Sequence, residues 1–313
     1  MINLLDFDNI KTMKEDTRKF AISTDSNSDF YADEIERFGL YVGRLNYTIT
    51  KDNVVNEYLD DFDKPEQYVE FYNTLRSGAL AKTSILNLQA HVDLFTRMAE
   101  DGVINALHIS QSAGLSPTID NANKAIEIVK EKYPNINFIA IESSTTTIGE
   151  QMLVEVAIKM RDDGKTNRET ADYINSIKNN LQHFIIADDL KYLCRGGRVS
   201  AASALFGSLL QIKPIIEFSK KGKLEVTRKI SGLNKAVKTV IEDFGKYSLN
   251  KDFPLIKIVH TDNLPLAQKM QDMFFELYGI RPEIRIMGPI IGAHVGPNAV
   301  AYGFISEQPR NAD

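Results

Sequence analysis

The sequence is poor in the residues that stabilise proteins outside a reducing compartment or anchor them in a membrane. Among its 313 residues Cys194 is the only cysteine, so no intramolecular disulfide can form, which favours a reducing compartment. Residues 1–19 contain acids and lack the apolar core of a signal peptide. No stretch approaches the roughly 20 apolar residues of a membrane-spanning helix. These absences predict a cytoplasmic protein and allow only transient contact with a membrane surface.

Excess positive charge is missing as well. The chain has 42 acidic and 37 basic residues, a formal net charge of −5. Non-specific nucleic-acid binding needs a basic face that neutralises phosphates, so no nucleic-acid partner is expected. The hydrophobic fraction of 43% is that of an ordinary globular protein.

Motifs of self-sufficient enzymes are also absent. There is no Gly-x-Ser-x-Gly nucleophile elbow and no phosphate loop ending in Gly-Lys-Ser/Thr. The five histidines are scattered without metal-ligand spacing. Cys194 has neighbouring arginines but no histidine or second cysteine nearby in the sequence, which argues against a catalytic thiol. The sequence therefore predicts no catalytic residues, no cofactor and no metal site.

What the first half does contain is an alternation of strand-like and helix-periodic segments. Such alternation implies crossover connections and a mainly parallel sheet flanked by helices. One segment, 51–63, is acidic and polar and is expected to be an exposed loop. The predicted strands are 20–24, 41–50, 103–109 and 137–141.

The second half has a different pattern and predicts an α+β region with a mixed sheet. Residues 214–218 and 224–229 flank Lys-Lys-Gly-Lys and predict a hairpin. An apolar helix is expected at 200–210, and a rigid Gly/Pro-rich loop at 288–297. We expect a two-domain α/β protein with a domain boundary near Leu181, giving domains 1–181 and 182–313.

Hydroxyl-bearing residues gather where the predicted strands end. Ser110-Gln111-Ser112 follows one strand, 143–147 follows the next, and Thr83-Ser84 adds another pair. Ser and Thr also cap helices, so any single cluster is compatible with a purely structural role. Because ligands bind beyond the carboxyl ends of parallel strands, the convergence of several clusters favours a polar ligand site.

Two further segments are candidates for the same site. Gly196-Gly197-Arg198 combines close backbone approach with an arginine that could bind a carboxylate or phosphate. A glycine helix terminator with an exposed arginine explains it equally well. His294 lies between Gly-Pro elements that would hold it in place. The apolar segment 205–216 is ordinary core by composition, or part of a tunnel wall.

Taken together these segments resemble the DegV family, which includes the fatty-acid-binding subunits of bacterial fatty acid kinase. The resemblance spans residues 20–305 and depends on the order and spacing of several short motifs. They are Asp25-Ser26, Lys82-Thr83-Ser84, Ile109 to Thr118 (ISQSAGLSPT), Asp189 to Ser200 (DLKYLCRGGRVS), Ile212-Lys213-Pro214 and Gly292 to Pro297 (GAHVGP).

The resemblance implies that a fatty acid lies between two domains. Its carboxyl group would be held by Thr83, Ser84 and Ser112, with Arg198 and His294 as further ligand-binding residues, and its tail would enter an apolar tunnel. A separate ATP-dependent kinase subunit would phosphorylate the bound carboxyl group. The chain departs from the family pattern at residues 85–87, where the family has Gln-Pro-Ser, and at Ala113, where a second serine is common.

Two other classes of function remain open at this point. One is an enzyme that acts on a small phosphorylated or carboxylated metabolite, with the hydroxyls and Arg198 as an anion cradle. The other is a regulatory protein whose ligand is incidental.

Overall fold

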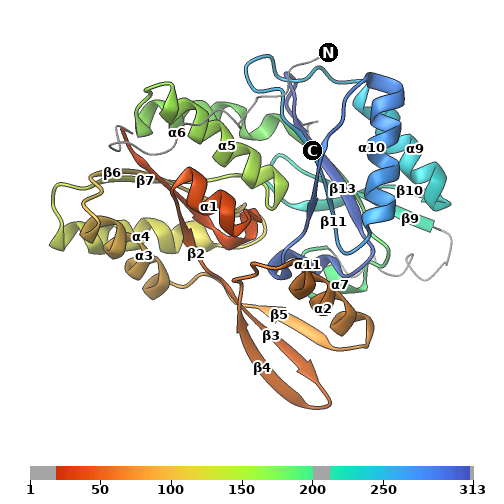
Figure 1. Ribbon diagram of the computed structural model, residues 1–313, viewed down its shortest axis with the longest axis horizontal. Helices are drawn as coiled ribbons and strands as arrows, with labels where there is room; N and C mark the ends of the chain where they lie inside the picture. The colour runs from red at the N-terminus through yellow and green to blue at the C-terminus, as the bar shows by residue number, and fades with distance from the viewer. Residues whose placement is uncertain (1–18, 200–211, 311–313) are drawn as a thin grey trace.

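The computed structural model describes residues 19–199 and 212–310. Over these residues the chain forms three β-sheets with helices packed around them, and a hairpin projects from the body (Figure 1). The predicted apolar helix at 200–210 lies outside the described residues. No helix in the described ranges is long and apolar enough to cross a membrane.

Sheet A contains four parallel strands in the order β2-β1-β6-β7. Since the four strands run in one direction, they all end at the same edge of the sheet. Their last residues are Asp25, Gly43, Ser110 and Glu142. The predicted parallel sheet of the first half is thus confirmed. Its strands are β1 (Ala21–Asp25), β2 (Leu40–Gly43), β6 (Asn105–Ser110) and β7 (Asn137–Glu142).

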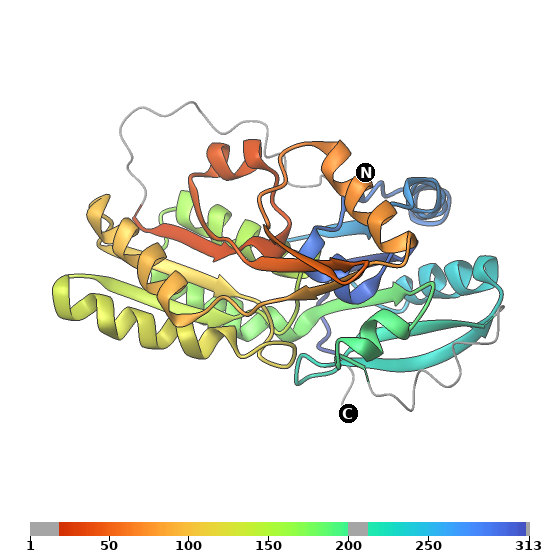
Figure 2. The same ribbon diagram turned by 90° about the horizontal axis from the view of Figure 1, so that it is seen from below.

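Helices cover both faces of sheet A (Figure 2). On one face, α3 (Leu88–Glu100) and α4 (Thr118–Lys132) bury an apolar stripe that includes Phe95 and Ile126. The other face packs against α5 (Ile148–Asp162), with α1 (Ala32–Phe38) and α6 (Asn167–Ile177) beside it. Helix α5 also contacts sheet C, so it is buried on nearly all sides.

Sheet B corrects two expectations from the sequence. The predicted single strand at 41–50 is wrong, because the chain leaves sheet A at Gly43 and starts a new sheet at Asn46. The predicted loop at 51–63 is also wrong. Asp52 and Asn53 have φ values of 51° and 62°, which is typical of two-residue hairpin turns. The antiparallel strands are β3 (Asn46–Lys51), β4 (Val54–Leu59) and β5 (Leu80–Thr83), in the order β4-β3-β5.

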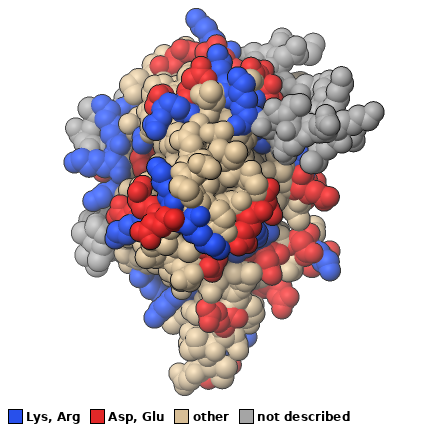
Figure 3. All heavy atoms as spheres, turned by 90° about the vertical axis from the view of Figure 1, so that its left-hand side faces the viewer, with Lys and Arg blue, Asp and Glu red and all other residues tan. Residues whose placement is uncertain are grey.

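Strand β4 is exposed along its whole length although it carries large apolar side chains. Val54 and Val55 are 58% and 62% exposed. Figure 3 shows positive and negative side chains interspersed over the body, whereas the protrusion at the bottom carries few charges. Polar and acidic neighbours in the sequence concealed this strand.

Sheet C has six strands in the order β10-β9-β8-β13-β11-β12, with only β11 and β12 parallel. The predicted mixed sheet and the hairpin that joins β9 to β10 are confirmed. The strands are β8 (Leu181–Ile186), β9 (Ile212–Phe218), β10 (Leu224–Ser231), β11 (Ile256–His260), β12 (Glu283–Ile286) and β13 (Val300–Ile305). Helices α9 (Leu233–Phe244) and α10 (Leu264–Tyr278) pack on one face.

The predicted Gly/Pro-rich loop at 288–297 is in fact largely helical. Helix α11 (Pro289–Val295) begins with proline at its first turn, where no backbone N–H is needed. Gly292 lies inside this helix. A Cβ at this position would be 2.4 Å from the hydroxyl oxygen of Tyr72, so the close contact with Tyr72 requires a glycine. Gly296, with φ of 79°, ends it. Glycine therefore serves close packing here as well as chain reversal.

Sheet B and α2 (Pro65–Arg76) pack against the C-terminal half of the chain. Phe71, Tyr72 and Leu75 of α2 share one apolar cluster with Ile290 and Ala293 of α11. Sheet C begins at Leu181. The domain boundary near that residue stays a prediction, and α2 and sheet B are the segments of the first part that pack against α11 of the second.

Candidate functional site

A cavity of about 210 Å³ lies beyond the carboxyl-terminal edge of sheet A, between that edge and α11. It is bounded by the end of β5, the segment between β6 and α4, the loop after β7, helix α7 (Lys191–Arg195) with the residues after it, and α11. It thus lies where the fold of an open parallel sheet places ligands.

The cavity is lined by apolar residues and by a smaller number of polar side chains. The described lining residues include no aspartate or glutamate, and Arg198 is the one charged side chain among them. The apolar lining comprises Leu45, Ile85, Leu115, Pro117, Leu193, Leu224, Ile290, Ile291 and Val295. The polar lining comprises Thr83, Ser84, Gln111, Ser116, Thr146, Arg198 and His294.

Thr83 at the end of β5 and His294 on α11 meet in the lining of this cavity. The Thr83 Oγ1 atom lies 2.8 Å from His294 Nε2. Burial, with a smaller effect from the nearby Arg198 charge, lowers the pKa of His294 to about 4. The imidazole is therefore neutral at neutral pH. If Nε2 carries its proton, Thr83 accepts from the ring and keeps its own hydroxyl proton for a ligand oxygen.

Arg198 supplies the positive charge of the site. Its side chain is half-buried, one guanidinium nitrogen donates to the Gly196 carbonyl oxygen, and burial lowers the pKa of the guanidinium. A Cβ on Gly196 would lie 2.4 Å from His294 Nδ1. The glycine therefore allows the segment that carries Arg198 to reach His294.

Four of the five predicted site residues, Thr83, Ser84, Arg198 and His294, line this one cavity. Ser84 is exposed at its margin. Ser112 is different, because it is fully buried and is absent from the described lining.

The Ser112 hydroxyl group contacts the hairpin turn of sheet C. It donates to the Gly222 carbonyl oxygen at 2.8 Å and accepts from the Gly114 N–H at 3.1 Å. Its hydrogen bonds join the two halves of the chain, and this placement does not favour the predicted contact with a ligand.

The sequence prediction did not assign Gln111, Ser116 and Thr146, which also line the cavity. All three belong to the hydroxyl-rich segments after β6 and β7, so the signal was present. Which side chain of each run faces the cavity depends on how the loop is folded. The predicted tunnel wall at 205–216 is described only from Ile212 onward, and Ile215 and Ile216 lie in the apolar core.

A second hollow, of about 350 Å³, lies beside the β9–β10 hairpin. Its lining includes Arg228 and Arg310 but also Glu217 and Asp243. Arg228 is paired with both acids, and Arg310 donates to backbone carbonyls of Leu181, Ser144 and Ser219. These cations stabilise the fold, so this hollow is a weaker candidate for an anion site.

Fold and cavity together define a two-part α/β protein with an amphiphilic cavity at the carboxyl-terminal edge of its parallel sheet. A family model described as "Uncharacterised protein, DegV family" matches residues 19–307. The chain belongs to the DegV family.

Relatives are similar over nearly their full length. A DegV domain-containing protein of Clostridium perfringens is 32% identical over 93% of this chain and 98% of its own. A solved structure described as a fatty acid binding DegV family protein, from Streptococcus agalactiae, is 27% identical with a TM-score of 0.77. The alignment covers 94% of this chain and all of that one. A stearic acid-binding protein of Eubacterium ventriosum shares the fold, with a TM-score of 0.79 at 19% identity, over 92% of this chain and 98% of that one.

Proposed function

We propose that this protein binds a fatty acid, with the carboxyl group at the polar side of the cavity and the acyl chain along its apolar wall. The observation that carries the proposal is the composition of the described lining, in which one arginine and a few uncharged polar side chains adjoin an apolar wall and no acid is present. A single, half-buried cation favours a ligand with a single negative charge. Relatives described as fatty-acid-binding support the same ligand class.

The head group would be held by Thr83, with Arg198 balancing its charge. A carboxylate that is buried without partners costs several kcal/mol, so the cation and the hydroxyl donor are both needed. His294 would act through Thr83, because its neutral ring orients the hydroxyl group at 2.8 Å. Ser84 would contact the head group from the exposed margin.

The acyl chain would supply most of the affinity. Each buried methylene contributes about 0.8 kcal/mol, so about 15 of them give a gross gain near 12 kcal/mol before the cost of association. The cavity, at about 210 Å³, is below the roughly 300–1,000 Å³ of pockets that enclose a small ligand. A long chain therefore requires the wall to open.

The apolar core next to the cavity offers a direction for that opening. Leu193, Leu224, Ile291 and Val295 line the cavity and also belong to the core cluster that contains Met287 and its neighbours. Displacing these side chains would extend the cavity into the apolar core cluster beside it. The acyl chain would thus replace side-chain contacts with contacts of the same kind.

We further propose that the protein presents this acid to a separate kinase subunit and does not itself catalyse a reaction. The exposed Ser84 and Ile85 at the margin of the cavity leave the proposed head-group end near the surface, where a second protein could reach it. The described lining offers no carboxylate to act as a general base.

The first experiment is lipid extraction of the purified, denatured protein followed by mass spectrometry. A stoichiometric fatty acid supports the proposal. A phosphorylated metabolite in its place would favour an enzyme for small anions, and an empty protein that also fails to bind added fatty acids would contradict fatty-acid binding.

A second experiment tests the head-group residues with a matched pair of variants. Arg198→Ala should weaken fatty-acid binding about 10- to 100-fold, because a charge-assisted hydrogen bond is worth about 1.5–3 kcal/mol. Arg195→Ala removes an exposed arginine of the same segment, which lies outside the described lining, and should bind normally. With a bacterial fatty acid kinase and ATP, only Arg198→Ala should lose acyl-phosphate formation. Equal activity of the two variants would refute the assignment of Arg198.

A further inference from the structure

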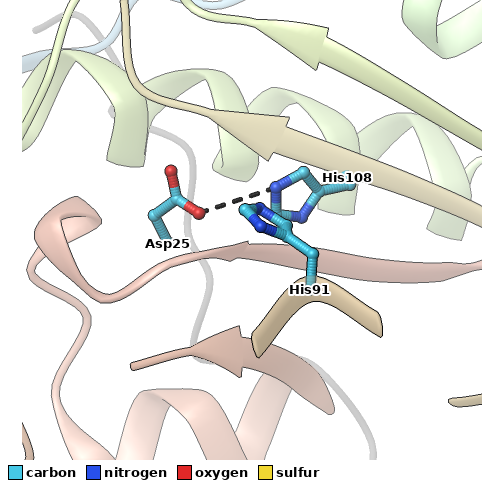
Figure 4. Close-up of side chains that lie close together, drawn as sticks. All are labelled: Asp25, His91 and His108. Carbon is cyan, nitrogen blue, oxygen red and sulfur yellow. Dashed lines mark ion pairs between the residues drawn. The ribbon is translucent and has the colours of Figure 1, made fainter. Parts of the chain in front are cut away.

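Three buried side chains from separate elements meet in the interior of the first half. Asp25 ends β1, His91 lies on α3 and His108 lies on β6. All three are at most 1% exposed. Figure 4 shows the two imidazole rings next to each other, with the Asp25 carboxylate directed at them. One possible ligand atom from each residue lies within 4.8 Å of those of the other two.

Each of these side chains is held through one of its two polar atoms. His91 Nδ1 lies 3.1 Å from the Asn87 carbonyl oxygen, and since a carbonyl only accepts, the ring proton is on Nδ1 and Nε2 keeps a lone pair. His108 Nδ1 lies 3.0 Å from Ser23 Oγ. The Asp25 Oδ2 atom accepts from Ser110 Oγ at 2.8 Å. Metal-binding histidines and carboxylates are oriented by outer contacts of this kind.

The second polar atom of each side chain is left without a hydrogen-bond partner, although His108 Nε2 and Asp25 Oδ1 lie 3.6 Å apart. Asp25 Oδ1, His91 Nε2 and His108 Nε2 are buried and have no hydrogen-bond partner within the described part of the chain. Unpaired buried polar atoms are rare in folded proteins. Three of them in one cluster indicate that something else binds there.

The charge of the surroundings favours a cation. Glu150 is also fully buried and interacts with Asp25 electrostatically. Within the described ranges, neither carboxyl group has an ion pair with a lysine or arginine. A carboxylate that is buried without a cation nearby costs free energy, and a bound metal ion would offset that cost.

We propose that Asp25, His91 and His108 bind one divalent transition-metal ion of the Zn²⁺ type. Imidazole nitrogen and carboxylate oxygen are common zinc ligands at about 2.0–2.2 Å, which puts neighbouring ligand atoms roughly 3.4 Å apart in a tetrahedral site. The distance from His108 Nε2 to Asp25 Oδ1 is 3.6 Å. Rotation of the side chains closes the remaining separation, and water takes the fourth position. The ion would join β1, β6 and α3, and none of its three ligands is among the described lining residues of the fatty-acid cavity.

The test measures metal content and metal binding of the full chain. Protein stripped with a chelator is reloaded with Zn²⁺, dialysed and analysed by mass spectrometry for metals, and Co²⁺ is used as a spectroscopic probe. We expect one ion per chain, visible absorption bands of Co²⁺ bound to nitrogen, and a higher Tm with Zn²⁺ than with chelator.

Matched variants separate the cluster from the other histidines. Asp25→Asn and His91→Gln should weaken Zn²⁺ binding at least 10-fold. His183→Gln changes another buried histidine, which contacts Thr145, and should bind normally. Wild-type protein that retains no Zn²⁺ and shows no Co²⁺ bands would overturn the proposal, whether or not the variants fold. Equal loss in His183→Gln would do the same.

Discussion

Two hydroxyl groups that the sequence assigned to one task, those of Thr83 and Ser112, have different surroundings in the folded chain. The Thr83 hydroxyl is partly exposed in the cavity and pairs with His294. The Ser112 hydroxyl is fully buried and joins the first half of the chain to the Gly222 carbonyl in the second.

This difference separates a ligand contact from an internal one. A hydroxyl at a strand end is equally suited to either, because its hydrogen-bonding capacity is the same in both settings. What distinguishes them is whether a cavity adjoins the group. Changes at the Ser112 contact should therefore act on stability, and changes at Thr83 should act on ligand binding.

The largest effect is expected where Ser112 meets Gly222. In Gly222→Ala the new Cβ would lie 2.0 Å from Ser112 Oγ, at a φ of 67°. The backbone strain and the overlap together should lower the free energy of unfolding by about 3 kcal/mol or more. Urea unfolding measures this.

Gly279→Ala is the matched control. Gly279 has a φ of 68° but nothing within 4 Å of a Cβ, so only the backbone cost of about 1–2 kcal/mol remains. If both variants lose the same amount, the Ser112 contact is not as tight as described.

The next largest effect is a dependence of stability on pH. Of the two contacts, only that of Thr83 includes a titratable partner, His294. The folded-state pKa of His294 is about 4, below its ordinary value of 6.5, so the unfolded chain takes up the proton first. The contribution of neutral His294 to stability is complete above pH 6.5 and is lost as the pH falls towards 4. It amounts to about 2 kcal/mol after allowance for partial exposure.

Urea unfolding between pH 7 and 4 tests this in two variants. His294→Asn should lose less stability on acidification than the wild type. Ser112→Ala should follow the wild-type slope, because its partner is a carbonyl. Parallel slopes for all three proteins would show that His294 does not titrate as described.

A smaller effect is expected for Ser112→Ala itself. Its removal leaves the Gly222 carbonyl and the Gly114 N–H without this partner, which should cost about 1–2 kcal/mol of unfolding free energy. The folded variant should bind fatty acid with wild-type affinity. A loss of affinity comparable with that of Arg198→Ala would move Ser112 back into the ligand site.

The smallest effect on stability is expected for Thr83→Val. The substitution keeps the shape and removes a partly exposed hydroxyl, so the free energy of unfolding should fall by about 1 kcal/mol or less. Fatty-acid affinity, measured by displacement of a fluorescent analogue, should fall about 10-fold. Unchanged affinity would exclude Thr83 as a head-group donor.

The sequence was informative wherever local chemistry decides structure. Alternating strands and helices identified the parallel sheet, and the Lys-Lys-Gly-Lys turn identified the β9–β10 hairpin. It was misleading at 51–63, where polar composition concealed β4, and at 288–297, where glycines that allow close packing in α11 were taken for a loop.

By itself the sequence determined the fold class, the family and four residues that share one cavity, because periodicity and short motifs are local properties. Only the tertiary structure decided that Ser112 faces the hairpin turn while Thr83 faces the cavity. It also brought Asp25, His91 and His108 together across gaps in the chain that no spacing rule covers. The physical reason is that burial and contact depend on which elements pack against each other, and neighbours in the sequence do not specify that.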